Sequence, residues 1–203
     1  MKNYGNINSD LLRVWQQHIA AGDQHAFRQL FNAFAERLTY FAFSITRNKE
    51  ASMEIMDEVF IRIWKNRSHL PEIDNITTYL YTAIKNTSLN YLSKKANEQI
   101  TQPFDFLNVL LEENASPEQS LISSEIMKKI QAAVENLPPK CKMIFKLVRE
   151  DGLKYKEVAD VLNISVNTVD AQMVIAVKKI SEKVKAHFDF FPGKKHEKKQ
   201  DFL

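Results

Sequence analysis

The sequence predicts an all-α protein made of two small helical domains joined by a flexible linker. With 4 glycines and 6 prolines in 203 residues, the chain has few of the turn residues that a β-rich fold requires. Apolar residues recur at spacings of three and four along most of its length. Between residues 97 and 116 this periodicity fades, and acidic residues occur without any lysine or arginine.

Residues 10–96 are predicted to form the first domain. Asp23 can cap a long helix whose apolar face runs from Phe27 to Ile45. A break at Arg47-Asn48 is expected to end this helix. The next helix is predicted at residues 50–65.

A loop containing Pro71 should follow, and Asp74 or Asn75 can cap a third helix that ends near Lys95. The acidic segment 97–116 then reads as the linker. Twenty extended residues span at most about 65 Å, so the two domains could contact one duplex about two turns apart.

The second domain is predicted at residues 117–185, and its first helix should begin at Ser116, which has Pro117 and Gln119 in capping positions. That helix is expected to reach Glu135, and another should span residues 140–149. The basic segment 186–203 is predicted to be a disordered tail.

The pattern from about 153 to 179 predicts a helix-turn-helix, formed by helices at 153–163 and 166–185. Asn163 stands where the turn needs a left-handed residue, and Ser165 can cap the second helix. Ile164 is expected to fill the corner. The core is expected to continue through Val169, Met173, Val177 and Ile180.

The opposite face of the second helix carries side chains suited to base edges, because Asn and Gln can bond adenine and Ala can contact a thymine methyl. Lysines nearby can meet phosphates. An ordinary helical hairpin with a solvated face is the alternative. The predicted DNA-binding residues are Lys154, Lys156, Ser165, Asn167, Thr168, Ala171, Gln172, Ile175, Lys178 and Lys179.

Several motifs together resemble the extracytoplasmic-function (ECF) sigma factors of bacterial RNA polymerase. The second half has LPPKCKMIF at 137–145 and SVNTV at 165–169. The first half has GDQHAF at 22–27, DEVFIRIW at 57–64 and YLYTAIKN at 79–86. The resemblance covers about residues 10–185 in the family's order.

The resemblance implies a specificity subunit that binds core RNA polymerase and directs it to promoters. The helix at 57–64 would bind a coiled coil of the largest subunit. The first domain would recognise and open the minus-10 element, with an unstacked base held by the loop at 67–75, and the helix-turn-helix would read the minus-35 element. An anti-sigma factor, often membrane-bound in this family, is the expected inhibitor.

Two residue sets are expected to serve these roles in the first domain. A polar stripe at spacing of four, with tyrosines nearby, can meet unpaired bases; buried tyrosines and a merely solvated stripe are the alternative. The predicted minus-10 residues are Tyr79, Thr82, Asn86, Asn90 and Lys94. The predicted polymerase-binding residues are Asp57, Glu58, Phe60, Arg62 and Trp64.

The chain departs from the family at positions that usually carry charge. Members often have Asp near Asn90, Arg near Ser93, and cations around Asp170 and Gln172. This chain therefore presents fewer positive charges to DNA. Weak binding to DNA without polymerase is expected, and the promoter preference of other members does not transfer.

Other classes fit the sequence less well. The five histidines lack metal-ligand spacing, and no nucleotide-binding or nucleophile motif occurs, so no enzyme, metal, cofactor or small-molecule substrate is expected. Cys141 is expected to be a core thiol. Without a signal-type or membrane-spanning segment, the chain is expected in the cytoplasm. A helix-turn-helix regulator that acts without joining polymerase remains the alternative.

Overall fold

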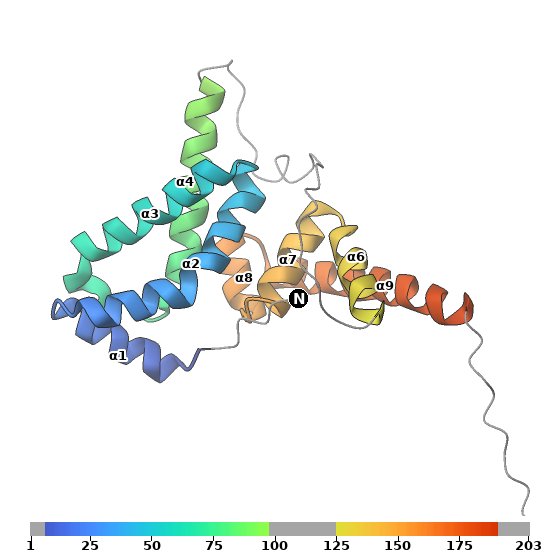
Figure 1. Ribbon diagram of the computed structural model, residues 1–203, viewed down its shortest axis with the longest axis horizontal. Coiled ribbons are helices and arrows are strands. Elements are labelled where there is room, and N and C mark those ends of the chain that lie inside the picture. Colours follow the sequence, from blue (N-terminus) through green and yellow to red (C-terminus); the bar gives the residue numbers. More distant parts are fainter. Residues whose placement is uncertain (1–6, 98–124, 191–203) are drawn as a thin grey trace, which may run out of the picture.

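The computed structural model describes residues 7–97 and 125–190, and these residues form helices and connecting turns without any strand (Figure 1). The all-α prediction is thereby confirmed. The predicted helix start at Ser116, most of the predicted linker and the end of the tail lie outside the described residues.

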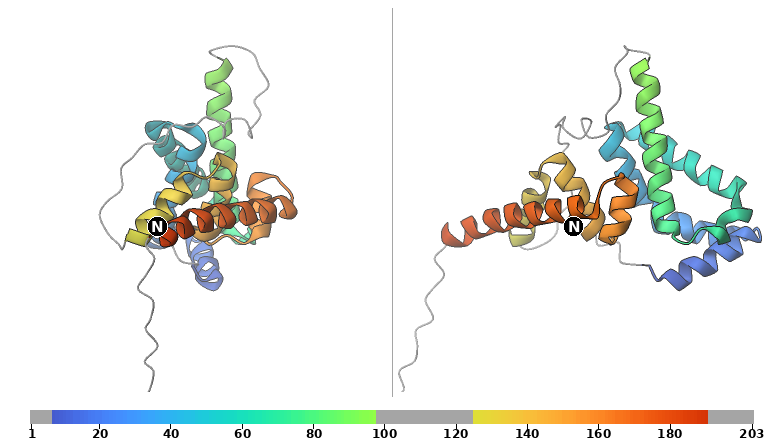
Figure 2. Two further views of the ribbon diagram at one scale, coloured as in Figure 1. Left: turned by 90° about the vertical axis from the view of Figure 1, so that its right-hand side faces the viewer. Right: turned by 180° about the vertical axis from the view of Figure 1, so that it is seen from behind.

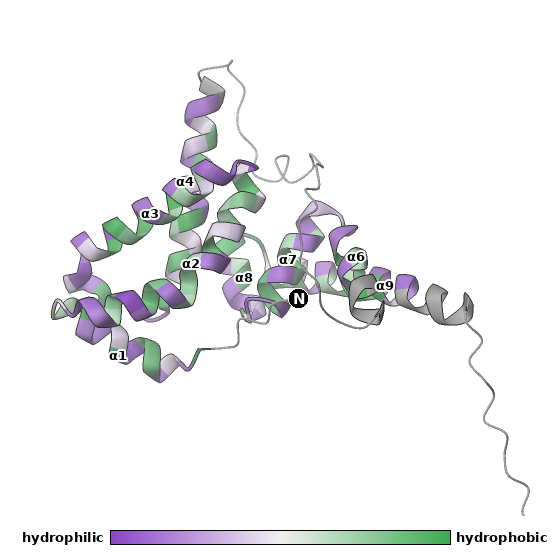
Figure 3. Cartoon of the chain, viewed as in Figure 1, coloured by the Kyte–Doolittle hydropathy of each residue, from purple (hydrophilic) through white to green (hydrophobic). Residues whose placement is uncertain are grey.

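The N-terminal half folds as helices that pack around α2. Hydrophobic and hydrophilic segments alternate along α2 and α3, as expected of helices with one buried face (Figure 3). The elements are α1 (Ser9–Ala20), α2 (Gln24–Thr46), α3 (Lys49–Lys65), the 3-10 helix η1 (Arg67–Glu72) and α4 (Ile76–Asn97).

Side-chain oxygens cap the N-termini of these α-helices, as capping statistics predict for Asn and Asp. Asp23 accepts bonds from the backbone N–H groups of His25 (2.7 Å) and Ala26 (3.2 Å), and these bonds lower the pKa of its carboxyl. Asn75, rather than Asp74, caps α4 by accepting from the N–H of Thr78 (3.0 Å). The predicted break after α2 is confirmed, because Arg47 adopts the left-handed conformation with φ 54°.

The C-terminal half packs around α9. Its helices are α6 (Glu125–Glu135), α7 (Pro139–Arg149), α8 (Tyr155–Leu162) and α9 (Val166–Phe190), and both α6 and α7 contact α9. Helix α9 extends past the predicted end at Lys185, so residues 186–190 are helical. Its core register also differs from the prediction at one position. Ala176 is fully buried while Val177 is 46% exposed, because the inward face follows a spacing of three after Met173.

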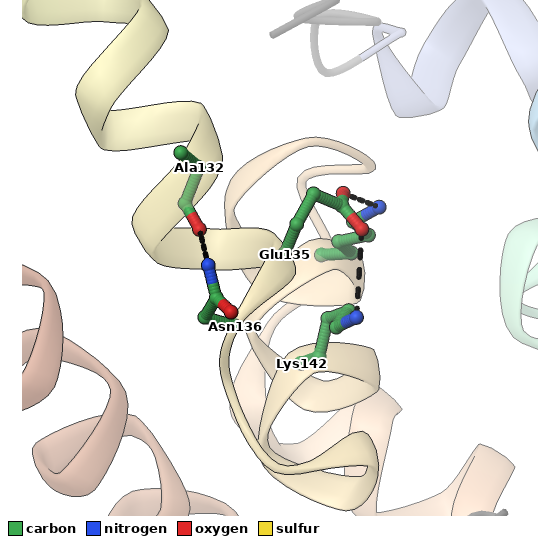
Figure 4. A network of polar contacts seen from close by, with 5 residues as sticks. Ala132, Glu135, Asn136 and Lys142 are labelled. Carbon is green, nitrogen blue, oxygen red and sulfur yellow. Dashed lines mark hydrogen bonds and ion pairs between the residues drawn. The ribbon is translucent and has the colours of Figure 1, made fainter. Parts of the chain in front are cut away.

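Polar contacts tie the end of α6 to α7 (Figure 4). The Glu135 carboxylate accepts from Lys146 Nζ at 2.8 Å and from Lys142 Nζ at 3.4 Å. Burial alone would raise the pKa of Glu135, but the two ammonium groups outweigh it and the pKa is lowered. Asn136 closes the helix end by donating to the carbonyl of Ala132 at 2.6 Å.

The turn between α8 and α9 has the geometry that the sequence predicts. Asn163 is left-handed, with φ 55° and ψ 51°, and the N–H of Ile164 bonds the carbonyl of Ala159 at 3.0 Å. Ser165 caps α9 by accepting from the N–H of Thr168 at 3.0 Å. Ile164 is half-buried and packs against the core, so it fills the corner as expected.

The two halves touch each other directly. Helix α8 packs against α4, and the two helices lie side by side in Figure 2. One buried apolar cluster continues from Leu80 and Ile84 of the N-terminal half to Val158 and Val161 of the C-terminal half. The C-terminal end of α4 and the second half of α9 extend away from this junction in different directions (Figures 1 and 2).

Substitutions at Asn163 should separate the conformational requirement of the turn from its side-chain chemistry. Asn163→Val should lower stability by about 1–2 kcal/mol, because a β-branched residue is strained at positive φ. Asn163→Gly should be nearly neutral. Thermal unfolding of the two variants tests this, and equal midpoints would contradict a left-handed requirement.

Candidate nucleic-acid interface

The predicted base-reading residues share one exposed face of α9. Asn167, Ala171 and Ile175 are exposed, and Thr168 and Gln172 are half-buried beside them. Spacings of three and four place these five side chains on adjacent turns of one surface. A face of this width matches the part of a recognition helix that enters a major groove.

Two of the predicted contacts also serve the helix itself. Ser165 Oγ lies 2.8 Å from Thr168 Oγ1 and accepts from the Thr168 N–H. The hydroxyl oxygens of Ser165 and Thr168 are therefore partly engaged in hydrogen bonds within the protein, which leaves less of their bonding capacity for DNA. Among the described residues, the side-chain amides of Asn167 and Gln172 make no recorded hydrogen bond, so these two predicted base-reading residues keep their donors and acceptors available.

Cys141 of α7 contacts the backbone of α9 beneath this exposed face. Its thiol donates to the backbone carbonyl of Gln172 at 3.3 Å, and it is buried in α7, as expected of a core thiol. Burial raises the pKa of the thiol, since the thiolate would lose hydration. The contact joins α7 to α9 at the turn that carries the predicted base-reading residues.

The four lysines predicted to contact phosphates lie at two edges of the helix-turn-helix. Lys154 and Lys156 are exposed at the start of α8, and Lys178 and Lys179 are exposed midway along α9. Exposed Asp170 lies on the first turns of α9. The surface is therefore cationic at its edges and not at its centre, which favours positioning on phosphates over strong unspecific attraction.

The polar stripe of α4 is available to a ligand. Tyr79, Asn86, Asn90 and Lys94 are exposed and Thr82 is half-buried, and the end of α4 projects beyond the other helices (Figure 1). The neighbouring Tyr81 is fully buried and packs edge-on against Phe41, with ring centroids 5.1 Å apart. Tyr81 therefore belongs to the core, as one of the two sequence interpretations anticipated.

Gln16 of α1 positions the loop before α4, and sequence analysis missed it. Its side chain is 2% exposed, and its Nε2 donates to the carbonyls of Leu70 (2.7 Å) and Ile73 (2.8 Å). These bonds hold η1, which occupies the segment expected to be an irregular loop. The available signal was a glutamine in the apolar register between Leu12 and Ile19.

The predicted polymerase-binding residues divide between the surface and the core. Asp57, Glu58 and Arg62 are exposed on α3, where Arg62 pairs with Glu58 one turn away. Phe60 is 3% exposed and packs edge-on against Phe31, with ring centroids 5.0 Å apart. Burial removes Phe60 from any docking surface, so we reassign it to the core.

Trp64 is intermediate between the exposed and the buried members of this set. It is half-buried, its ring centroid is 5.0 Å from that of Phe27, and the Arg67 guanidinium stands 4.9 Å from its centroid. Its remaining surface lines an open pocket together with Gln24 and Phe31. Trp64 can therefore support the core and still meet a partner.

Within the described residues, no cluster of three His, Cys, Asp or Glu side chains could hold a metal ion. None of the described helices is both long and apolar enough to cross a membrane.

Comparison with protein families matches both halves of the chain. The family model described as Sigma-70 region 2 matches residues 30–98, and the model described as Sigma-70, region 4 matches residues 127–180. The ECF sigma factor SigW of Bacillus subtilis is 23% identical over 164 residues, covering 77% of this chain and 88% of its own length. The chain belongs to the ECF sigma factors.

Other relatives of this ECF sigma factor agree over most of its length. The ECF sigma-E factor of Escherichia coli K12 is 24% identical over 179 residues, covering 85% of this chain and 93% of that protein. Among solved structures, the sigma factor RpoE of Bartonella quintana with its anti-sigma factor NepR matches with TM-score 0.56 and 16% identity, over 78% of this chain and 96% of that one.

A further structure, CnrH in complex with the cytosolic domain of CnrY, matches with TM-score 0.52 and 18% identity, covering 87% of this chain and 98% of that one. At these identities the two structures support the fold of the ECF sigma factor. Region 2 corresponds to the helices α2 to α4, and region 4 to the helices α6 to α9.

Substitutions on α9 should distinguish base reading from phosphate contact. Gln172→Ala should relax preference by about 1–3 kcal/mol at one base position. Lys178→Ala, its matched control, should weaken binding to all sequences alike and reduce the salt dependence. Binding-site selection measures the base preference, and binding titrations at several salt concentrations measure the salt dependence. An unchanged preference for Gln172→Ala would remove this residue from the predicted base-reading set.

Proposed function

We propose that this ECF sigma factor binds core RNA polymerase and directs it to specific promoters without catalysing a reaction itself. The observation that carries this proposal is the presence of regions 2 and 4, in that order, in one chain. A regulator acting alone would need only the helix-turn-helix and commonly carries a sensory domain with strands. Residues 7–97 contain helices and no strand.

The two domains would have different roles in promoter recognition. The first domain, residues 10–96, would bind polymerase through the exposed face of α3 and meet the opened minus-10 element along α4. The second domain, residues 117–185, would read the minus-35 element with α9. Support comes from the exposure of both polar faces and from the polar composition of the α4 stripe.

The partners that follow are core polymerase, promoter DNA and an anti-sigma factor. Two structural neighbours are described in complex with CnrY and with the anti-sigma factor NepR. We infer that this chain is held inactive by a protein of the same kind. Its site of action would be the cytoplasm, where polymerase transcribes.

Run-off transcription tests the proposed function. Purified chain added to core polymerase should give defined transcripts from a promoter that core alone ignores. Start sites mapped from those transcripts would identify the promoter elements. Sequence-specific DNA binding by the chain alone, without any stimulated initiation, would favour the independent regulator instead.

Charge reversal on α3 tests the polymerase surface. The double variant Asp57→Lys with Arg62→Glu should weaken binding to core polymerase at least about tenfold, because charged rim residues set association and specificity. Reversal of exposed Glu54 on the same helix is the matched control. Undiminished polymerase binding by the double variant would remove this surface from the assignment.

A further inference from the structure

The outward side of α9 carries a row of side chains that extends beyond the predicted base-reading set. Asn167, Asp170, Ala171 and Val174 are all exposed, and they follow the spacing i, i+3, i+4 and i+7 of a single helical stripe. Neither Asp170 nor Val174 is among the residues predicted to contact bases. We call these four residues the outer row.

The outer row lies on the far side of α9 from its buried residues. Val169, Met173 and Ala176 are buried, and at about 100° per residue the outer row points away from them. Gln172 is only half-buried because it stands nearer to the buried side. The side chains that would reach furthest into a groove are therefore those of the outer row.

Val174 is the member of this row whose position the fold does not explain. It is 61% exposed, the largest value among the exposed large hydrophobic side chains of the described residues. Valine forms helices less readily than alanine, and an exposed valine gains little from burial. Together with Ala171 and Ile175 it makes an apolar patch on the exposed side of the helix. In the major groove, the apolar group that a base presents is the 5-methyl of thymine.

The charges around Val174 favour a base edge over the DNA backbone as its contact. Asp170, one turn before Val174, would repel a phosphate, whereas a carboxylate can accept a hydrogen bond from the amino group of cytosine. Lysines suited to phosphates stand further out, with Lys178 one turn after Val174 and Lys154 at the start of α8. An anion in the middle and cations beyond it direct the row towards base edges.

The length of the outer row fits a short stretch of groove. Val174 stands seven positions after Asn167, a rise of about 10 Å at about 1.5 Å per residue. Three base pairs at about 3.4 Å each cover the same distance. A major groove about 12 Å wide admits a helix, so the row can meet about three adjacent base pairs.

We propose that Val174 determines promoter specificity by contacting the 5-methyl group of a thymine in the minus-35 element, as part of a base-reading row with Asn167, Asp170 and Ala171. This inference rests on the proposed function, because it names a base feature that the same helix recognises. The row favours methyl and amino groups of bases over guanine, whose usual partners are Arg and Lys.

Replacement of thymine by uracil tests the contact, because the two bases differ only by this methyl group. Holoenzyme formed from core polymerase and the full chain is titrated against a promoter mapped by run-off transcription, with each thymine of the minus-35 element replaced in turn. At one position uracil should weaken wild-type binding about fourfold, the loss expected for one buried methyl group. At that position Val174→Ala should bind thymine and uracil templates equally.

Val177→Ala is the matched control. Val177 is also an exposed valine of α9, at 46%, but it lies outside the outer row and should keep the fourfold preference for thymine. Both variants should unfold at or slightly above the wild-type temperature, because alanine is the better helix former. Thermal unfolding therefore separates a lost contact from a lost fold.

Several outcomes would overturn this inference while the proposed function stands. They are run-off by the wild type with no uracil-sensitive thymine, a preference that Val174→Ala leaves intact, and an equal loss of preference in Val177→Ala. If the wild type shows no preference while Val174→Ala initiates poorly from every template, the patch serves a protein partner instead. Tighter binding only to templates with 5-methylcytosine would reassign the methyl group to that base. Absence of run-off by the wild type would reject the proposed function itself.

Discussion

The packing of α4 is the constraint on which the rest of this molecule depends. One side of α4 completes the core of the first domain against α2 and α3, and another part contacts α8 of the second domain. The sector that carries Tyr79, Asn86 and Asn90 is left to solvent. The helix that we assign to the minus-10 element is therefore also the element through which the two halves of the chain are joined.

Local chemistry explains why much of the fold could be predicted from the sequence. Capping residues such as Asp23 and the left-handed Asn163 act within a few residues of their own position, so their roles can be predicted from the local sequence. The same is true of the predicted base-reading face on α9, because its members follow helical spacing. Val177 shows the limit of periodicity, because a shift of one position moves a side chain from the core to the surface.

Contacts between distant segments could not be predicted in this way. Gln16 bonds residues more than fifty positions away, and Asn75 bonds a residue 82 positions away. A surface amide and a buried amide with two carbonyl partners look alike in a sequence. Phe60 shows a similar ambiguity for an aromatic residue. From the sequence of an amphipathic helix it could belong to the core or to a docking surface, and its packing against Phe31 decides for the core.

The exposed sector of α4 has a consequence for how such proteins diversify. Asn86 and Asn90 are exposed, so their replacement should cost little in folding, and under the proposed function it should alter which promoters are used. Tyr81, on the same helix, is fully buried and constrained by its packing against Phe41. Duplicated copies of this chain could therefore acquire separate sets of target genes by drift along a single helical stripe while the scaffold beneath it stays unchanged.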